Sequence, residues 1–224
     1  MASLPKICFP ELSPSIRTPK TAGLAMHFTL TDLVTDITQN GAESGADLVE
    51  LMIRETGVNS GGKREFRFTV KDNGKGMTDE EMTLAQDPFV TDGVKHPNRK
   101  VGFGLPFLIQ TAEASGGGWK MESKKRGAAE DGAAINAGTE VSAWFDLDNV
   151  DTPPVGDLPG MFRTALLFGG PAEIVIRRSR EEPPLDYEIR KTELAEALGG
   201  DLEDVQSLLL LDQYLRSLEE AADE

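Results

Sequence analysis

Residues 65–77 read EFRFTVKDNGKGM, a segment in which polar and apolar residues alternate before a glycine-rich turn sequence. Every second residue from 66 to 70 is apolar, which predicts a β-strand with one buried face. Gly74 and Gly76 carry no side chain, so a ligand can approach the backbone closely there. Asp72 at the end of the strand offers an acceptor for an amino group. A solvent-exposed turn is the other interpretation that this stretch permits.

Upstream of this strand, the apolar residues from position 30 to 37 recur at the spacing of a helix with one buried face. Asp36 and Asn40 are four residues apart, so a helix brings a carboxylate and an amide oxygen side by side. This pair of oxygen donors suits a hydrated Mg²⁺ ion. A solvated helix face explains the same spacing, and both interpretations stay open at this point.

Downstream, Gly102-Phe103-Gly104-Leu105 opens a predicted helix that runs to about residue 115. Backbone N–H groups at the start of a helix can face phosphate oxygens, and the helix dipole favours that contact. The glycines would equally serve close packing. Residues 87–101 lack periodicity and carry basic side chains, which is typical of a mobile loop.

Further elements are expected at several places along the chain. The pattern predicts strands at 47–55, 65–71, 119–123, 139–146 and 172–178. Thr78 and Glu81 predict a capping box for a short helix, and another short helix is expected at 158–168. Residues 202–218 predict an amphipathic helix with Leu202, Val205, Leu208, Leu209, Leu215 and Leu218 on one side. This leucine face is expected to dock on the chain itself or on a partner.

The order of these motifs resembles the nucleotide motifs of the GHKL ATPases. This family comprises bacterial histidine kinases, mismatch-repair ATPases, type II topoisomerase subunits and heat-shock chaperone ATPases. The matching stretches are the N-box at 36–46 (DITQNGAESGA), the G1 box at 72–77, the G2 box at 102–105 and Gly138-Thr139. Residues 87–91 (DPFVT) resemble the phenylalanine box of histidine kinases. The resemblance covers about residues 26–148.

The resemblance implies an α/β protein with the Bergerat fold, a two-layer α+β sandwich. In this fold a mixed β-sheet carries helices on one face, and ATP lies between the helices and a flexible lid. We expect an extended arm at 1–22, the histidine kinase-like ATP-binding domain at 23–149 and a C-terminal α/β extension, mostly helical, at 150–224.

The resemblance also assigns roles at the ATP site. Asp72 would contact the adenine amino group with support from Thr139, and Asn40 would be the Mg²⁺ ligand. The other residues expected at the nucleotide are Gly74, Gly76, Met77, Lys95, Arg99, Lys100, Gly102, Phe103, Gly104 and Leu105. The three basic residues in that set would reach the phosphates from the lid, although a solvated loop explains them as well.

One position departs from the family pattern. Relatives that hydrolyse ATP usually carry Glu four residues before the Asn, and here that position is Asp36, shorter by one methylene group. A general base must lie within about 3 Å of the attacking water. ATP binding is therefore expected to be intact, whereas the hydrolytic role of Asp36 is left open. Histidine kinases tolerate several residues at this site.

The expected activity follows from what accompanies the motifs. The only histidines, His27 and His96, do not sit on a dimerisation helix pair upstream of the N-box, so a protein substrate would come in trans. We expect a Mg²⁺-dependent ATP-binding protein that acts as a trans-acting kinase or an ATPase switch on a protein partner. Residues 150–224 would supply the surface that binds this partner. A catalytically inactive nucleotide-sensing module is the alternative.

Composition limits the partners and the setting. The chain has 23 Lys and Arg against 38 Asp and Glu, a formal net charge of −15, which argues against nucleic acid or an anionic membrane as a partner. The single cysteine, Cys8, cannot form an intramolecular disulfide. No signal peptide or membrane span is visible in the sequence. We therefore expect a cytoplasmic protein.

Overall fold

The computed structural model describes residues 28–58, 62–87, 104–127 and 137–220. The expected N-terminal arm at 1–22 lies outside these ranges. So does most of the lid, because residues 88–103 are not described.

A six-stranded mixed sheet forms the centre of the molecule, with strand order β3-β4-β2-β1-β5-β6. All neighbouring strands are antiparallel except β1 and β5, which are parallel. The elements in chain order are α1 (Leu30–Glu43), β1 (Leu48–Thr56), β2 (Glu65–Asp72), α2 (Asp79–Ala85), α3 (Gly104–Ala114), β3 (Gly118–Lys124), β4 (Gly138–Asp146), α4 (Leu158–Leu166), β5 (Glu173–Arg180), β6 (Leu185–Arg190), α5 (Lys191–Ala197) and α6 (Val205–Glu220).

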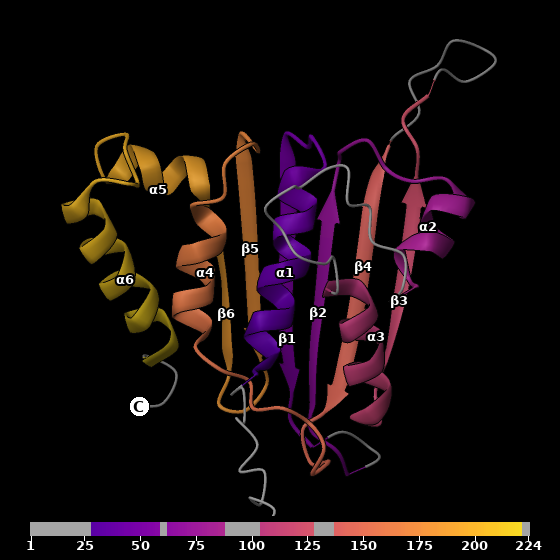
Figure 1. The fold of residues 1–224 in the computed structure, drawn as a ribbon. Coiled ribbons are helices and arrows are strands. Elements are labelled where there is room, and N and C mark those ends of the chain that lie inside the picture. Colours follow the sequence, from indigo (N-terminus) through magenta and orange to yellow (C-terminus); the bar gives the residue numbers. More distant parts are fainter. Residues whose placement is uncertain (1–27, 59–61, 88–103, 128–136, 221–224) are drawn as a thin grey trace, which may run out of the picture.

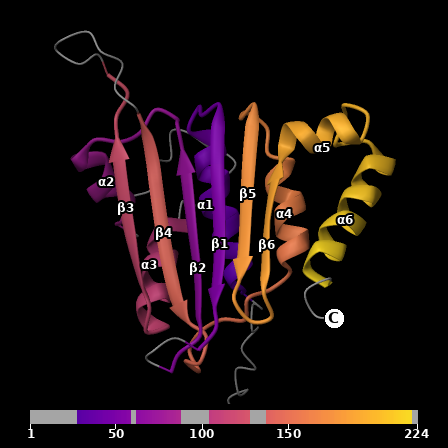
Figure 2. The same cartoon turned by 180° about the vertical axis from the view of Figure 1, so that it is seen from behind.

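The helices α1, α3 and α4 cover one face of this sheet (Figure 1), and the opposite face carries no helix (Figure 2). The core lies between the two layers, where Leu33 and Val34 of α1 meet Leu51, Phe68 and other buried residues of the strands. Two layers packed over one core are typical of an α+β sandwich. The predicted fold class, a mixed sheet with helices on one face, is confirmed.

Strand β2 shows how the sequence positions the polar end of the sheet. Phe66, Phe68 and Val70 are buried beneath the helices, as their alternation predicted. Asp72 continues the same alternation, so its carboxylate lies on the helix-covered face. In the antiparallel register it stands opposite Thr139 of β4.

Helices α1 and α2 each begin at a side-chain cap. Thr29 caps α1 in a capping box with Asp32, and Thr78 caps α2 with Glu81, as the sequence predicted for the second. The backbone N–H groups of Leu30 and Thr31, which have no acceptor within the helix, donate to the carbonyls of residues 154 and 155. The start of α1 is therefore fixed by the chain that follows β4 as well as by its own cap.

Residues 150–220 share the sheet with the preceding part of the chain. β5 pairs with β1 along residues 48–55, and β6 adds an edge strand beyond it. Strand β6 and helix α5 were not predicted. The alternation of Leu185, Tyr187 and Ile189 was the available signal for β6, but it is short and interrupted by charged residues.

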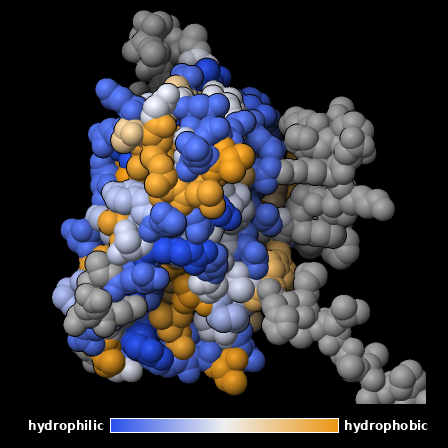
Figure 3. Space-filling model, turned by 90° about the vertical axis from the view of Figure 1, so that its left-hand side faces the viewer, coloured by the Kyte–Doolittle hydropathy of each residue, from blue (hydrophilic) through white to orange (hydrophobic). Residues whose placement is uncertain are grey.

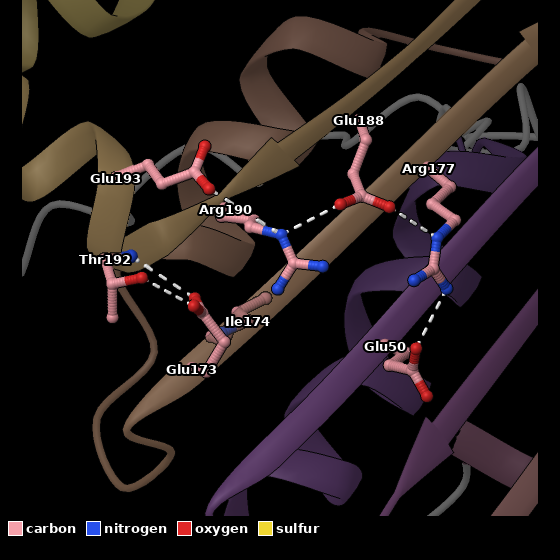
Figure 4. A network of polar contacts seen from close by, with 8 residues as sticks. All are labelled: Glu50, Glu173, Ile174, Arg177, Glu188, Arg190, Thr192 and Glu193. Carbon is pink, nitrogen blue, oxygen red and sulfur yellow. Dashed lines mark hydrogen bonds and ion pairs between the residues drawn. The ribbon is translucent and has the colours of Figure 1, made fainter.

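The open face of the sheet is polar. Arg177 of β5 donates to Glu50 of β1 at 2.8 Å and to Glu188 of β6 at 2.7 Å, and Glu188 also accepts from Arg190 at 2.8 Å (Figure 4). Exposed ion pairs stabilise a protein by only about 0–1 kcal/mol each. Their presence explains why this face needs no covering layer. Within the described ranges, no helix has the length and apolarity required to cross a membrane.

A buried arginine fastens the last turn of α6 to the sheet. The side chain of Arg178 is fully buried and pairs with Glu55 at 2.5 Å and with Glu219 of α6 at 3.2 Å. The hydroxyl of Tyr187 donates to the same Glu219 carboxylate at 2.5 Å, and burial raises the pKa of this tyrosine. Breaking such a pair leaves a buried charge without a partner, which is strongly destabilising.

The predicted buried face of α6 is wrong in part. Val205 is 70% exposed and Leu209 is 61% exposed, whereas Ser207, Leu211 and Leu215 are buried at four-residue steps. Four consecutive leucines, 208–211, occupy every side of the helix, so the sequence pattern alone does not select the face that packs.

Candidate functional site

A buried carboxylate marks the end of β2. Asp72 is 8% exposed, and its Oδ1 accepts hydrogen bonds from the backbone N–H of Gly74 at 2.8 Å and from the Ser44 hydroxyl at 2.9 Å. Burial raises the pKa of Asp72, while these two donors and the backbone N–H of Thr139 oppose that shift. A carboxylate has about four acceptor positions. Three donors therefore leave acceptor capacity for a ligand.

This carboxylate borders a cavity of about 790 Å³. The volume lies within the range of about 300–1,000 Å³ that small-molecule sites occupy. Two methionines, Met82 of α2 and Met121 of β3, supply flexible apolar surface. The full lining is Leu48, Glu50, Lys71, Asp72, Asn73, Met82, Met121, Glu122, Ser123, Lys124, Arg126, Ala137, Gly138, Thr139 and Glu140. A buried acceptor beside apolar side chains suits a flat heterocycle that bears an amino group.

A chain of hydroxyl groups connects the turn after β2 to the hairpin of β3 and β4. Ser123 Oγ lies 2.9 Å from Thr139 Oγ1 and accepts from the Met77 backbone N–H at 2.8 Å. The structure thus brings together Asp72 and Thr139, the two residues expected at the adenine. Met77 is not among the residues that line the cavity, and its backbone N–H is bonded to Ser123. Met82 and Met121, which the sequence reasoning missed, line the cavity instead.

The glycines of the turn are required by close packing within the protein. A Cβ on Gly74 would lie 1.9 Å from Ser44 Oγ, and a Cβ on Gly76 would lie 1.8 Å from the carbonyl oxygen of Lys124. Gly76 also has φ +61°, a conformation that other residues adopt at a cost. Both glycines therefore let the turn fold tightly against its neighbours and keep Asp72 at the cavity.

Ser44 is a site residue that sequence reasoning missed. It follows α1 as its C-terminal cap, and its hydroxyl reaches both the Gly41 carbonyl at 2.7 Å and Asp72 Oδ1 at 2.9 Å. The only signal in the sequence was its place within the N-box. Its contact with Asp72 depends on how closely α1 approaches β2, which the sequence does not specify.

We expect Ser44→Ala to weaken nucleotide binding without unfolding the protein. Loss of one hydrogen bond costs about 1 kcal/mol, which corresponds to a roughly fivefold higher Kd for ATP. Isothermal titration calorimetry with Mg²⁺-ATP measures this change. Ser142→Ala is the matched control, since Ser142 bonds Thr69 on the open face of the sheet. An equal Kd in both variants would remove Ser44 from the site.

A second group of expected residues meets at α1 and α3. Asp36 and Asn40 lie on the exposed side of α1. A Cβ on Gly104 would lie 3.5 Å from Asp36 Cβ and 3.8 Å from Asn40 Nδ2, so the first residue of α3 faces the polar stripe of α1. Leu105, the next residue, packs into the core.

The two groups are connected through one residue of α1. Asn40 is not among the residues that line the cavity. The next residue, Gly41, packs directly over the site, because a Cβ there would lie 3.6 Å from Asp72 Cβ. Asn40, the expected metal ligand, is thus the neighbour in α1 of Gly41, which packs against the Asp72 carboxylate expected to bind adenine.

The remaining expected residues cannot be placed. Lys95, Arg99, Lys100, Gly102 and Phe103 lie outside the described residues. In the part of the chain that the structure describes, no cluster of three or more His, Cys, Asp or Glu side chains could hold a metal ion. The oxygen donors of Asp36 and Asn40 therefore fit a Mg²⁺ ion that takes most of its ligands from water and substrate phosphates. Mg²⁺ is commonly bound in this way.

Comparison with known proteins identifies the family. Residues 27–149 match the model of the histidine kinase-, DNA gyrase B-, and HSP90-like ATPases, which is more than half of the 224-residue chain. The chain belongs to this family of GHKL ATPases, and membership implies that it binds ATP. The matched region runs from α1 through β4 and ends before α4. No curated protein matches the chain.

Proposed function

We propose that the chain is a Mg²⁺-dependent ATP-binding protein that acts in trans on a protein partner, as a kinase or as an ATPase switch. The observation that best supports this proposal is the buried Asp72 carboxylate, held by Ser44 and Gly74 at the edge of a cavity of about 790 Å³. A fixed acceptor in a low-dielectric site discriminates strongly between ligands with and without a matching donor.

Each residue then has a defined task. Asp72 accepts a hydrogen bond from the adenine amino group, with the neighbouring Thr139 in support. Asn40 supplies one amide oxygen to Mg²⁺, which neutralises charge on the phosphates when it is bound. Gly104 gives the phosphates access to backbone at the start of α3. Phosphoryl transfer depends mainly on such positioning and electrostatic support, so no covalent role is assigned to the protein.

A nucleotide-sensing module without catalysis is the second candidate, and Asp36 supports it. This carboxylate occupies the position of the usual glutamate with a side chain one methylene shorter. A shorter side chain either moves the attacking water or gives up the role of general base. In that case ATP would alter partner binding without being consumed.

The fate of the γ-phosphate separates these functions. If Asp36 is the general base, Asp36→Asn lowers phosphate release by about 10²–10⁴-fold, the usual contribution of general-base catalysis. ATP affinity should stay near the wild-type value, because a general base contacts the attacking water and not the nucleotide. Assays with γ-labelled ATP and calorimetry measure the two quantities.

Asp36→Glu serves as the control, since it restores the longer side chain with the same charge. Equal rates of phosphate release in wild type and Asp36→Asn would exclude Asp36 as the base. A wild type that binds ATP, but neither releases phosphate nor labels a partner, would leave the sensing module as the function.

A further inference from the structure

The hydroxyl group of Ser123 has three polar partners at the cavity. Its Oγ accepts from the Met77 backbone N–H at 2.8 Å, donates to the Gly138 carbonyl oxygen at 3.0 Å and lies 2.9 Å from Thr139 Oγ1. Ser123 and Thr139 stand opposite each other in the register of β3 and β4, and both line the cavity. The roles assigned to the nucleotide site leave Ser123 without a task.

The single proton of Ser123 limits how these contacts can coexist. A hydroxyl group donates one hydrogen bond and accepts two. The Met77 N–H can only donate and the Gly138 carbonyl can only accept, so Ser123 spends one acceptor position on the first and its proton on the second. The third contact then forms only if Thr139 donates to Ser123. This is the one arrangement in which all three contacts are hydrogen bonds at once.

Thr139 therefore commits its own proton to Ser123. The remaining positions on Thr139 Oγ1 are lone pairs, so this hydroxyl can only accept a hydrogen bond from a ligand. Asp72 stands opposite Thr139 in the register of β2 and β4, and an ionised carboxylate likewise only accepts. Side chains paired in this way have Cβ atoms about 4.5–5.5 Å apart. The cavity thus presents two neighbouring acceptors.

We infer that Ser123 is a positioning residue that fixes the Thr139 hydroxyl as an acceptor, so that Asp72 and Thr139 together read the exocyclic amino group of the base. Such a group has two N–H bonds. Acceptors about 2.9 Å from its nitrogen, one on each bond, lie about 5 Å apart, a span that side chains paired across two strands can provide. The inference deepens the proposed function, on which it rests for the identity of the ligand.

Purine riboside 5′-triphosphate is the probe for this reading, because it carries hydrogen in place of the 6-amino group of ATP. Isothermal titration calorimetry with Mg²⁺, or competition against ATP where binding is weak, gives the Kd of each nucleotide for the full-length chain. The measured quantity is the Kd of the probe divided by the Kd of ATP, here called the amino ratio. Two unpaired acceptors should make this ratio roughly tenfold or more in the wild type.

Ser123→Ala is expected to lower the amino ratio about fivefold, the effect of one hydrogen bond. Without Ser123 the Thr139 proton can rotate, so the hydroxyl no longer presents acceptors alone. Ser123→Thr keeps the hydroxyl and should restore the ratio. A purely structural role of Ser123 would weaken both nucleotides equally and leave the ratio unchanged.

A double-mutant cycle shows whether Ser123 acts through Thr139. Thr139→Val removes the same hydroxyl from the other strand and should lower the amino ratio by a similar factor. Adding Ser123→Ala to Thr139→Val should then produce no further fall, because the residue that Ser123 positions is already gone. Far-ultraviolet circular dichroism checks that each variant stays folded.

The sheet offers a matched control in a second pair of hydroxyl groups. Thr69 Oγ1 and Ser142 Oγ lie 2.8 Å apart, joining β2 and β4 on the open face, and neither residue lines the cavity. Ser142→Ala therefore loses a comparable bond and should keep the wild-type amino ratio.

Leu209→Ser is a control at the far edge of the sheet. Leu209 is 61% exposed on α6, which lies beyond β6, whereas the cavity lies at the ends of β2, β3 and β4. Figure 3 shows this end of the molecule, where exposed hydrophobic side chains lie among hydrophilic ones. The Kd of both nucleotides should equal the wild-type values.

An amino ratio that is the same in wild type, Ser123→Ala and Thr139→Val would overturn the inference, since Thr139 would then face a part of the base that both nucleotides share. The Tm of the ligand-free proteins of the cycle gives an independent readout. Additive losses of Tm would show that the two hydroxyls do not bond and would overturn the inference as well. Coupled losses in a wild type that binds neither nucleotide would contradict the proposed function and leave the pair of Ser123 and Thr139 in place.

Discussion

Asp72→Ala is expected to remove almost all of the thermal stabilisation by Mg²⁺-ATP. At about 100 times Kd, a ligand adds about 2.7 kcal/mol to stability, which for a chain of this size raises Tm by roughly 5–10 °C. Asp72 provides the acceptor at the cavity and is held there by Ser44 and Gly74. A 100-fold rise in Kd, about 2.7 kcal/mol, would leave a gain of only about 1 °C at the same nucleotide concentration.

The comparison is made within each variant, with and without nucleotide. Asp72 is buried and its pKa is raised, so its removal changes the stability of the protein itself as well. Asp186→Ala is the control, an aspartate exposed on β6 at the other edge of the sheet. An unchanged ATP response in Asp72→Ala, measured by differential scanning fluorimetry, would show that this carboxylate does not contact the nucleotide.

Removal of residues 150–224 is expected to abolish cooperative folding. β1 would lose its parallel partner β5, and α1 would lose the backbone carbonyls of residues 154 and 155 that accept from its first N–H groups. Fully buried side chains of this segment each contribute about 1.5–3 kcal/mol; they include Phe162, Leu166, Ile174, Ile176, Leu211 and Leu215. Their sum reaches or exceeds the total stability of about 5–15 kcal/mol that is typical of a protein.

Circular dichroism during heating measures the effect of the truncation. The full-length chain should unfold in one sharp transition, and the 1–149 fragment should show none. A chain that ends at residue 220 is the control, since it keeps all of the described elements. A 1–149 fragment that melts cooperatively and responds to ATP would mean that residues 150–224 form an independent appendage.

Much of the sheet could be predicted from local pattern. β2 and β4 alternate apolar and polar residues because one face is buried and the other is open, and this pattern needs no knowledge of the neighbours. The N-terminal cap of α2 could be predicted from equally local sequence, since Thr78 and Glu81 are three residues apart. Such features depend only on residues that are close together in the sequence.

Features that depend on packing between distant segments could not be predicted. Ser44 reaches Asp72 because the last turn of α1 packs against the end of β2. The face on which α6 packs is set by its contacts with α4 and the sheet, such as Arg163 with Asp212, and not by its run of leucines. The parallel pairing of β1 with β5 joins strands more than a hundred residues apart, which no local pattern specifies.

The most direct test of the account compares Mg²⁺-ATP with Mg²⁺-GTP by isothermal titration calorimetry on the full-length chain. ATP presents an amino group to the Asp72 carboxylate, whereas guanine presents a carbonyl at the same position of the ring. A site built around a buried acceptor rejects a ligand that lacks the donor, by up to about 10⁴–10⁵-fold in favourable cases. The account predicts measurable binding of ATP and none of GTP under the same conditions. Equal affinity for the two nucleotides, or no binding of ATP, would contradict it.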